Sequence, residues 1–377
     1  MPEKKDVLTR YQLLCLGFLS LLSPIIRLLP GRAAEFSGSA AWLSAILSAI
    51  PVGLLFLLTG KYMKKALPKE GFGELFLRSL GKPVGKTILL LFTFWLIFYA
   101  AFALRSGADR YITAAYESSS PAVFICVMLV LALYAALGRF STLARCAAAF
   151  LPLMVLVLAV VFLLGFRDVD TAFLPLPTLS ELPAVLKGVP TISIVLSLSV
   201  YIGFLEGSVG EKEKRTKTMG LFLFLIISVV VLLCIVTVGA FGAKLTAKLH
   251  YPFFTLVRNL SLFNIVERLE ALVLGLWVIT DFLLVSTLLF IIVTNLGIIF
   301  GLGQLYAAGQ KRLSLKNGRW CIWASALVIL VLSLVLAPDS KTLEQLSLNV
   351  VPLLNLFFLF GLLPLSIAAG LLGGRLK

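Results

Sequence analysis

Charge is scarce in this sequence. Only 14% of its 377 residues are Asp, Glu, Lys or Arg, whereas 60% are hydrophobic. A water-soluble domain carries a larger charged fraction, because its surface has to face water. The composition therefore excludes a soluble globular domain and predicts an integral membrane protein.

Residues for metal binding, disulfides and catalysis are also scarce. The sequence has one histidine, His250. Its five cysteines lie singly in apolar segments, with no CxxC spacing: Cys15, Cys126, Cys146, Cys234 and Cys321. A single imidazole does not make a zinc site, and scattered thiols do not make a disulfide framework. The H-E-x-x-H, G-x-S-x-G and G-x-x-x-x-G-K-[ST] motifs are absent as well. We therefore expect no metal, no cofactor and no enzymatic activity.

Long apolar runs, by contrast, are abundant. A helix needs about 20 mostly apolar residues to cross a hydrocarbon core of about 30 Å. About ten runs meet this requirement: 11–30, 41–59, 86–105, 121–138, 143–166, 185–206, 218–243, 268–301, 320–337 and 347–370. We expect an all-α membrane protein with about ten transmembrane helices, in one polytopic domain that covers residues 1–377.

Basic residues predict how these spans are oriented. With the N-terminus on the cytoplasmic side, most of the 33 Lys and Arg residues fall in cytoplasmic loops, as the positive-inside rule requires. Both termini should then be cytoplasmic. The formal charge of +15 is explained by this orientation and by contact with anionic lipid headgroups. We expect no nucleic-acid binding, because no compact basic domain stands outside the spans.

Two runs, 11–30 and 185–206, are interrupted by residues that break or loosen a helix. The first contains Pro24, and the second contains Pro190 and Gly203. Proline removes a backbone donor and glycine loosens the chain. Interrupted helices at matching positions of a duplicated fold are typical of ligand sites in transporters. The sequence therefore predicts discontinuous first and sixth helices.

The interrupted runs also divide the chain into two sets of five spans. The first set covers residues 11–166 and the second covers 185–370, with the Pro-rich stretch Leu174-Pro175-Leu176-Pro177 between them. Five is an odd number, so the second set would be inserted upside down relative to the first. We therefore expect a 5+5 inverted repeat.

The interruptions offer freed backbone groups and hydroxyls to a solute. The candidate ligand-binding residues at these positions are Ser23, Pro24, Ile25, Ser197, Ser199, Tyr201 and Gly203. Small and polar residues also mediate ordinary packing between membrane helices, which is the alternative interpretation.

Two arginines lie at a similar predicted depth in the outer half of the membrane. Counted at 1.5 Å per residue along their spans, Arg27 and Arg105 come to nearly the same level. Both guanidinium groups would then face one outward-opening cavity and bind an anionic group together. In the alternative interpretation they pair with Glu35 or Asp109, or extend to the outer interface.

Asp281 is the most unusual acidic residue, because it lies deep within an apolar run. A carboxylate at that depth is costly and usually functional. It is a candidate to bind an ammonium group or a cation, or to take up a proton. The alternative is a buried hydrogen bond with a neighbouring Ser, Thr or Tyr.

One region of the chain resembles a known family. The stretch Tyr251-Pro252-Phe253-Phe254-Thr255-Leu256, followed by Glu267-Arg268-Leu269-Glu270 and Trp277, looks like the signature of the B subunit of nutrient germinant receptors in endospore-forming bacteria. The chain length, the ten spans, the Asp168-Val169-Asp170 loop and the charged loop from Glu211 to Lys217 also fall where that family places them. The resemblance therefore extends through nearly the whole chain.

This resemblance implies a fold and a set of partners. The family belongs to the amino acid–polyamine–organocation transporter superfamily, so the expected fold is like that of the bacterial leucine transporter, with a solute between the first, third, sixth and eighth spans. The expected partners are a small nutrient, membrane lipid, an A-type subunit and a lipoprotein C-type subunit. The expected location is the inner membrane of the spore or the cell membrane.

We therefore hypothesise that the chain is a germinant-receptor B-type subunit that binds a small nutrient, an amino acid or similar, at the broken-helix core. The alternative is an ion-coupled secondary transporter of amino acids or amines, because a receptor and a transporter can share one scaffold. Many relatives have glycine-rich residues at the first break, where this chain has Pro24 and Ile25. That departure leaves a third hypothesis, a structural scaffold without a ligand site.

Overall fold

A computed structural model describes residues 8–115, 119–176, 178–210, 215–260, 269–302 and 318–373. Within these ranges the regular structure is helical, and an isolated bridge pairs Leu8 with Val209. In the described part of the chain, seven helical stretches are long and apolar enough to cross a membrane: Arg10–Met63, Lys82–Thr113, Phe140–Asp168, Leu179–Ser208, Met219–Lys248, Glu270–Ile299 and Ser340–Leu372. Two shorter apolar helices are Pro121–Leu137 and Arg319–Val335. The all-helical class with membrane-spanning helices is thus confirmed, whereas the count of ten spans and the inverted repeat stay predictions.

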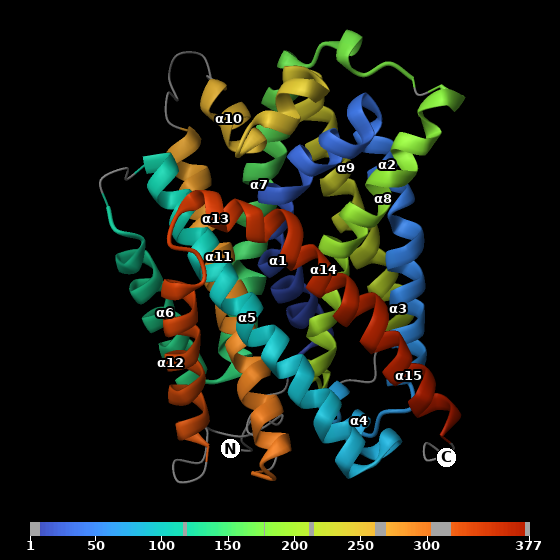
Figure 1. Cartoon of the computed structure of the whole chain (residues 1–377), viewed down its shortest axis with the longest axis vertical. Coiled ribbons are helices and arrows are strands. Elements are labelled where there is room, and N and C mark those ends of the chain that lie inside the picture. Colours follow the sequence, from blue (N-terminus) through green and yellow to red (C-terminus); the bar gives the residue numbers. More distant parts are fainter. Residues whose placement is uncertain are drawn as a thin grey trace, which may run out of the picture.

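The helices follow one another as shown in Figure 1. The first part of the chain forms α1 (Arg10–Ser37), η1 (Gly38–Ala40), α2 (Ala41–Leu47), α3 (Ala49–Met63), α4 (Phe72–Leu80), α5 (Lys82–Ala115), α6 (Pro121–Leu137) and α7 (Phe140–Gly165). Three short 3-10 turns follow: η2 (Phe166–Asp168), η3 (Thr171–Phe173) and η4 (Leu179–Glu181). The remainder forms α8 (Leu182–Leu196), η5 (Ser197–Ser208), α9 (Arg215–Lys248), α10 (Pro252–Asn259), α11 (Leu269–Ile299), α12 (Arg319–Val335), α13 (Ser340–Gln345), η6 (Leu346–Val350), α14 (Val351–Asn355), η7 (Leu356–Leu362) and α15 (Leu363–Leu372).

Helix α1 occupies the centre of the bundle. It packs against α7, α8, α9 and α11, and its apolar side chains are buried on several faces (Figure 1). A helix that is apolar all round belongs in a protein core. Its first turn is fixed by a capping box, in which the Thr9 hydroxyl accepts from the Gln12 amide and the Gln12 side chain accepts from the Thr9 amide. Figure 1 also shows α4 at one end of the bundle and α10 at the other, and we call these the α4 end and the α10 end.

The predicted break in the first helix is wrong. Helix α1 continues from Arg10 to Ser37 through Pro24 and Pro30. A proline inside a helix removes one backbone hydrogen bond, but membrane helices tolerate this where neighbouring helices support the backbone. Pro24 is buried among the helices that surround α1, so packing on several sides keeps the helix on one course.

The predicted break in the sixth helix takes the form of a change in helix type. The chain passes from α8 into the 3-10 helix η5 at Ser197, and η5 extends for 12 residues. Runs of 3-10 helix longer than about four residues are uncommon and often mark strain or a hinge. Gly203 lets this segment approach α4 closely, because a Cβ there would lie 2.0 Å from the ring of Phe72. The Phe72 and Phe204 rings, 5.4 Å apart between centroids, hold η5 against α4.

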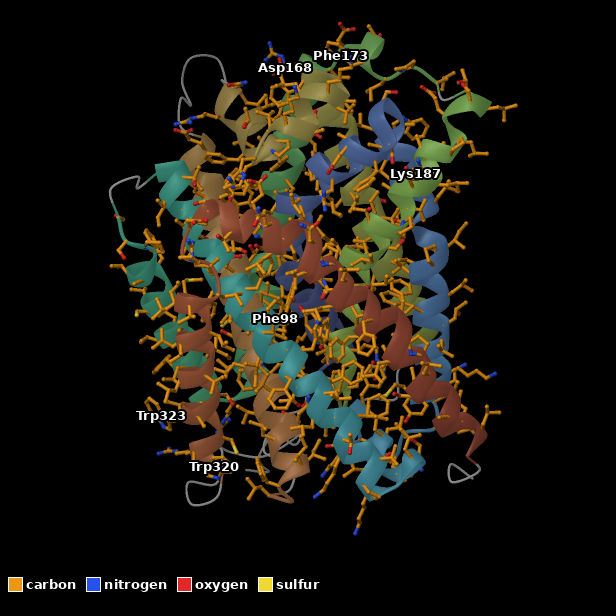
Figure 2. All side chains as sticks on the ribbon, in the orientation of Figure 1. Phe98, Asp168, Phe173, Lys187, Trp320 and Trp323 are labelled. Atoms are coloured by element: carbon orange, nitrogen blue, oxygen red, sulfur yellow. The ribbon has the colours of Figure 1, made fainter. Side chains whose placement is uncertain are left out.

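Aromatic side chains mark the α4 end of the outer surface. Trp320 and Trp323 on α12 are 48% and 55% exposed, and Figure 2 shows them near this end, pointing away from the bundle. Indole rings concentrate at the level of lipid headgroups. Asp168, Phe173 and Lys187 lie at the opposite end (Figure 2). The apolar surface between the two ends is therefore the part that faces lipid.

Helix α5 is longer than its predicted span. The span was predicted to end at Arg105, but α5 continues to Ala115. The additional turns carry Asp109, Arg110 and Tyr111, and all three of these side chains are buried. The C-terminal turns of α5 therefore place a cluster of buried polar side chains inside the bundle.

Candidate functional site

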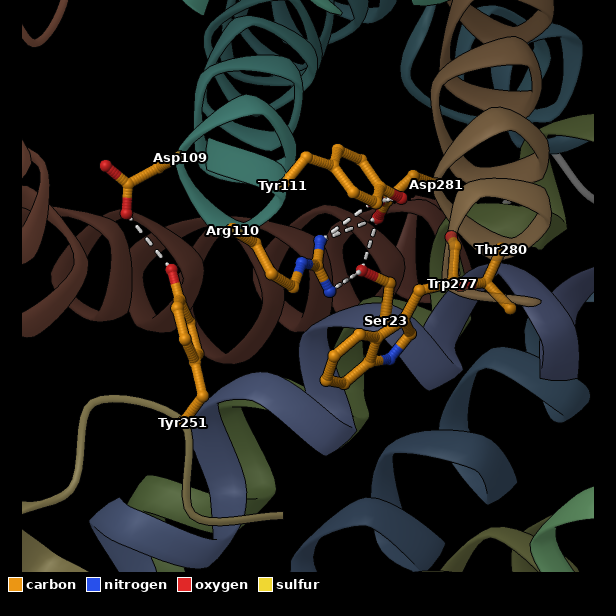
Figure 3. A network of polar contacts seen from close by, with 8 residues as sticks. All are labelled: Ser23, Asp109, Arg110, Tyr111, Tyr251, Trp277, Thr280 and Asp281. Atoms are coloured by element: carbon orange, nitrogen blue, oxygen red, sulfur yellow. Dashed lines mark hydrogen bonds and ion pairs between the residues drawn. The ribbon is translucent and has the colours of Figure 1, made fainter. Parts of the chain in front are cut away.

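Asp281 on α11 is the acceptor at the centre of a buried network (Figure 3). The Nη2 atom of Arg110 donates to both carboxylate oxygens, at 3.0 Å to Oδ1 and 2.8 Å to Oδ2. The Tyr111 hydroxyl donates to Oδ2 at 3.0 Å, and the Ser23 hydroxyl donates to Oδ1. Arg110 Nη1 also donates to the Ser23 oxygen at 3.1 Å. Because Ser23 lies on α1 and both Arg110 and Tyr111 lie on α5, one carboxylate links three helices.

An indole ring completes the surroundings of Arg110. The guanidinium carbon lies 4.9 Å from the centroid of the Trp277 ring, and Trp277 lies one turn before Asp281 on α11. The Arg110 and Asp281 side chains are only 1% and 6% exposed. A cation over an aromatic ring gains about 2 kcal/mol when it is desolvated. The charge of Arg110 is thus balanced by Asp281 and shielded by Trp277.

A second buried carboxylate, Asp109, lies at the α10 end. The Tyr251 hydroxyl donates to its Oδ2 at 3.1 Å, and the Ser340 hydroxyl donates to its Oδ1 at 2.5 Å. His250 Nε2 is 3.6 Å from Oδ2, and Arg105 Nη1 is 3.7 Å from Oδ1. Tyr251 immediately precedes α10, and Ser340 begins α13. Asp109 therefore holds both covering segments to the end of α5.

Tyr251 keeps its proton in this arrangement. Its burial, and then the negative charge of Asp109, raise the pKa of the phenol above its ordinary value. A neutral phenol is a donor, so Tyr251 donates to Asp109 throughout the neutral range.

A cavity of about 200 Å³ lies directly beneath these covering segments. Its charged and titratable lining residues are Arg27, Arg32, Glu35, Asp109, Lys248, His250, Tyr251 and Glu344. Arg32 is satisfied by Glu35, 2.6 Å away, and by the Leu348 carbonyl, 2.8 Å away. Arg27 packs over the Phe102 ring at 5.0 Å, and no carboxylate within the described part of the chain pairs with it. The cavity thus has a guanidinium group whose charge is not neutralised by a salt bridge.

The structure brings together some of the predicted ligand residues. Ser23 and Asp281 are hydrogen-bonded, and Arg27 follows Ser23 by one turn on α1. Arg105 is not among the residues that line the cavity with Arg27. It donates from Nε to the Ala337 carbonyl at 2.8 Å and lies against Asp109, as in the alternative interpretation.

The candidate ligand residues of η5 lie apart from Ser23, Arg27 and Asp281. Ser197 and Ser199 donate to carbonyls of the preceding turn, those of Ile194 and Leu196. Ser199 and Gly203 line a separate cavity of about 40 Å³. 

Tyr201 links η5 to the continuous helix α1 instead. Its hydroxyl lies 2.6 Å from that of Ser20, which joins η5 to α1. Pro24 and Ile25 are buried within α1 and line neither this contact nor the cavity beside Arg27.

Arg110 is the important residue that was missing from the predicted site. It lies beyond the predicted end of the third span, so hydropathy assigned it to a loop. One signal was available: Asp109, Arg110 and Tyr111 are three consecutive polar or aromatic residues about one turn after the apolar run that ends at Leu104. Of the sequence signature, Glu267 and Arg268 lie outside the described residues, as do residues 211–214 of the charged loop.

The fold and the polar centre define an all-helical integral membrane protein with charged groups buried among its helices. Intramembrane charges of this kind usually mark a functional site. Residues 7–341 match the sequence model of the spore germination protein family, and the chain belongs to that family. The resemblance inferred from the sequence is thereby confirmed.

Three relatives from Bacillus subtilis (strain 168) show how far the similarity extends. Spore germination protein KB is 23% identical over 365 residues, which cover 93% of this chain and 90% of that protein. Spore germination protein A2 is 25% identical over 244 residues, covering 64% of this chain and 66% of that protein. Spore germination protein YndE is 21% identical over 267 residues, covering 70% and 72% respectively.

Proposed function

We propose that this chain is the transporter-like B-type subunit of a nutrient germinant receptor, and that it binds a small nutrient through Arg27. The observation that carries the proposal is the position of Arg27. Its guanidinium lines a polar cavity and has no carboxylate partner in the described part of the chain. A guanidinium group binds a carboxylate strongly and with defined geometry. The ligand therefore has an anionic group.

Acidic residues of the same cavity favour an amino acid over a simple anion. Glu35 is paired with Arg32, and Asp109 is held by Tyr251 and Ser340. Glu344 on α13 also lines the cavity, and within the described residues it has no ion pair. A ligand with a carboxylate at Arg27 and an ammonium group towards Glu344 would satisfy both charges.

Binding at Arg27 would act on the buried network through α1. Ser23 precedes Arg27 by one turn, about 6 Å along the helix axis. Because α1 is continuous between these residues, a small displacement at Arg27 moves Ser23 relative to Asp281 and Arg110. A ligand that favours one of two arrangements of this network shifts the population of the whole bundle. Of the predicted ligand residues, the proposal keeps Arg27 as the contact and gives Ser23 and Asp281 this coupling role.

Family membership and the sequence pattern support the remaining parts of the proposal. The chain would have ten spans in a 5+5 inverted repeat and cytoplasmic termini. It would reside in the spore inner membrane or the cell membrane, with an A-type and a lipoprotein C-type subunit as partners. The shifted conformation of this chain would be sensed by those subunits.

Thermal unfolding of the purified protein in detergent tests the proposal. A panel of amino acids, nucleosides and sugars is compared, and a ligand at 100 times its dissociation constant should stabilise the protein by about 2.7 kcal/mol. Arg27→Gln should abolish the shift. Arg258→Gln is the matched control, because Arg258 is 61% exposed and lies outside the cavity. A shift that survives Arg27→Gln would contradict the proposed site, and no shift with any compound would favour a scaffold without a ligand.

Ion-coupled transport is a second candidate, favoured by the long 3-10 helix η5. Discontinuous helices are typical of the substrate sites of secondary transporters, and η5 interrupts the helix that would be sixth in the repeat, although α1 is continuous. Uptake of labelled amino acid into vesicles, driven by an ion gradient, would identify a transporter. Binding without uptake would identify a receptor.

A further inference from the structure

A second cavity adjoins the one that contains Arg27. Its volume is about 310 Å³, and it lies between α1, α5, the α8–η5 junction and the C-terminal helices. Four residues line both cavities: Leu28, Arg32, Ser347 and Leu348. The hydrogen bond from Arg32 Nη2 to the Leu348 carbonyl, 2.8 Å long, thus lies at the boundary between them.

The two cavities differ in chemical character. The first is lined by charged side chains of both signs. The second is lined mainly by apolar and uncharged side chains, among them Leu29, Tyr99, Ile194, Val195, Leu198 and Val351. Among the described residues, Arg32 is the one charged side chain that lines it, and that charge is already satisfied by Glu35. A polar chamber next to an apolar one matches an amphipathic ligand.

The volumes of the two cavities also fit a ligand with a polar part and an apolar part. Sites for small molecules usually have volumes of about 300–1,000 Å³. The polar cavity alone lies below this range, and the apolar cavity is the larger of the two. If the charged groups of a ligand lie in the polar cavity, the apolar cavity beyond Arg32 has room for a large hydrocarbon side chain.

We propose that the two cavities form one site for an α-amino acid with a bulky aliphatic side chain. The carboxylate lies at Arg27, and the side chain lies among Ile194, Val195 and Leu198. This inference rests on the proposed function and specifies the ligand class of the same site. It places the selecting residues on α8 and η5, whereas the charged groups of the ligand are held by α1 and α13.

The dissociation constants of glycine, alanine, valine and leucine for the purified chain in detergent test the inference. Each methylene that enters an apolar cavity contributes about 0.8 kcal/mol, which corresponds to about a fourfold change in affinity. Affinity should therefore rise stepwise from glycine to leucine. Equal affinity for glycine and leucine would overturn the two-part site and leave the proposed function intact. Failure of all four to bind, while another compound of the wider panel binds through Arg27, would overturn the inference alone, whereas failure of the whole panel would overturn both.

A substitution that fills the apolar cavity provides a second test of the inference. Val195→Phe should reduce the affinity for leucine to that for glycine, because the larger side chain occupies the space. Leu186→Phe is the control on the same helix, since Leu186 is 56% exposed and lines neither cavity. Arg27→Gln should weaken glycine and leucine by the same factor. If Val195→Phe also weakens both by the same factor, the side chain does not occupy this cavity and the inference is overturned.

Discussion

Two buried carboxylates meet at one part of α5, yet they connect different parts of the molecule. Asp109 belongs to α5, and Asp281 on α11 binds the next two residues of that helix, Arg110 and Tyr111. Asp281 is bonded to Arg110, Tyr111 and Ser23, so it connects the core helices α1, α5 and α11. Asp109 is bonded to side chains at the starts of α10 and α13.

The surroundings of the two carboxylates differ as well. Asp281 lies in full contact with Arg110, whose side chain is 1% exposed, whereas His250 beside Asp109 is 42% exposed. Asp281 thus lies in the core of the helix bundle, whereas Asp109 holds the starts of α10 and α13 over the cavity that contains Arg27. Adjacent residues of α5 thus have two tasks: Arg110 joins the core helices through Asp281, and Asp109 holds the segments that cover the cavity.

The largest effect is expected where the core carboxylate is removed. Asp281→Ala leaves the Arg110 charge buried without compensation, which should cost about 3–5 kcal/mol of unfolding free energy. The double variant Arg110→Met/Asp281→Leu should recover most of this loss, because no buried charge remains. Denaturant unfolding in detergent measures both. If the single variant is no less stable than the double variant, the pair does not clamp the helices.

Asp109→Ala should have a smaller and more local effect. Its loss removes the acceptor for Tyr251 and Ser340, and hydrogen bonds to a charged group contribute about 1.5–3 kcal/mol. Backbone hydrogen exchange should accelerate in α10 and α13 while α1 keeps its protection. A uniform acceleration across the bundle would show that Asp109 and Asp281 play the same role.

A matched pair of phenols sharpens the comparison. Tyr111 donates to Asp281 and Tyr251 donates to Asp109, so Tyr111→Phe and Tyr251→Phe each remove one donor. We expect each to cost about 1.5 kcal/mol at neutral pH, the lower end of the range for one hydrogen bond to a charged group, with the larger loss for Tyr111→Phe because Asp281 is enclosed by the core helices. Unfolding free energies of the two variants, measured side by side, give the order.

Alkaline pH distinguishes Tyr251 further. The pKa of Tyr251 is raised by burial and by Asp109, so the folded state binds its proton more tightly than the unfolded state. Its contribution is complete below the ordinary phenol pKa of about 10 and is lost as the pH rises from there towards the folded value. The wild type should therefore lose stability above about pH 10 more steeply than Tyr251→Phe. Identical pH profiles would exclude this linkage.

The smallest effect is expected at Asp339, which caps α13. Its carboxylate accepts from the Thr342 amide at 2.6 Å, and this hydrogen bond lowers the pKa of Asp339. The stabilisation is present above the ordinary carboxyl pKa of about 3.9 and disappears as the pH falls through the lower folded value. Asp339→Ala should slightly lower the unfolding temperature at neutral pH and have no effect in strong acid. An equal effect at both pH values would rule out the cap as its cause.

Hydropathy predicted most of the helices but not the polar centre. Hydropathy ended the third span at Arg105, because a charged residue usually marks the end of a transmembrane segment. Helix α5 continues because Asp109 and Arg110 find partners on other segments, far away in the sequence. Asp281 was recognised from its depth alone, whereas Arg110 required knowledge of those partners.

Local residue preferences explain why the two interruptions were predicted with unequal success. Pro24 predicts a break from its own chemistry, but the helices around α1 keep the backbone helical. At Ser197 and Gly203 the local preference and the packing agree, since hydroxyls bond to the preceding turn and glycine admits Phe72. A change of helix type therefore occurs at the second position and not at the first.

The 3-10 helix η5 also has a consequence for length. A 3-10 helix rises about 2.0 Å per residue, against about 1.5 Å for an α-helix. The 12 residues of η5 thus extend about 24 Å, where an α-helix would extend about 18 Å. The difference, about one turn of α-helix, lets a short segment reach the turn that precedes α4, where a Cβ at Gly207 would meet the Lys69 carbonyl oxygen at 2.4 Å. The helix type therefore determines the length that these 12 residues span.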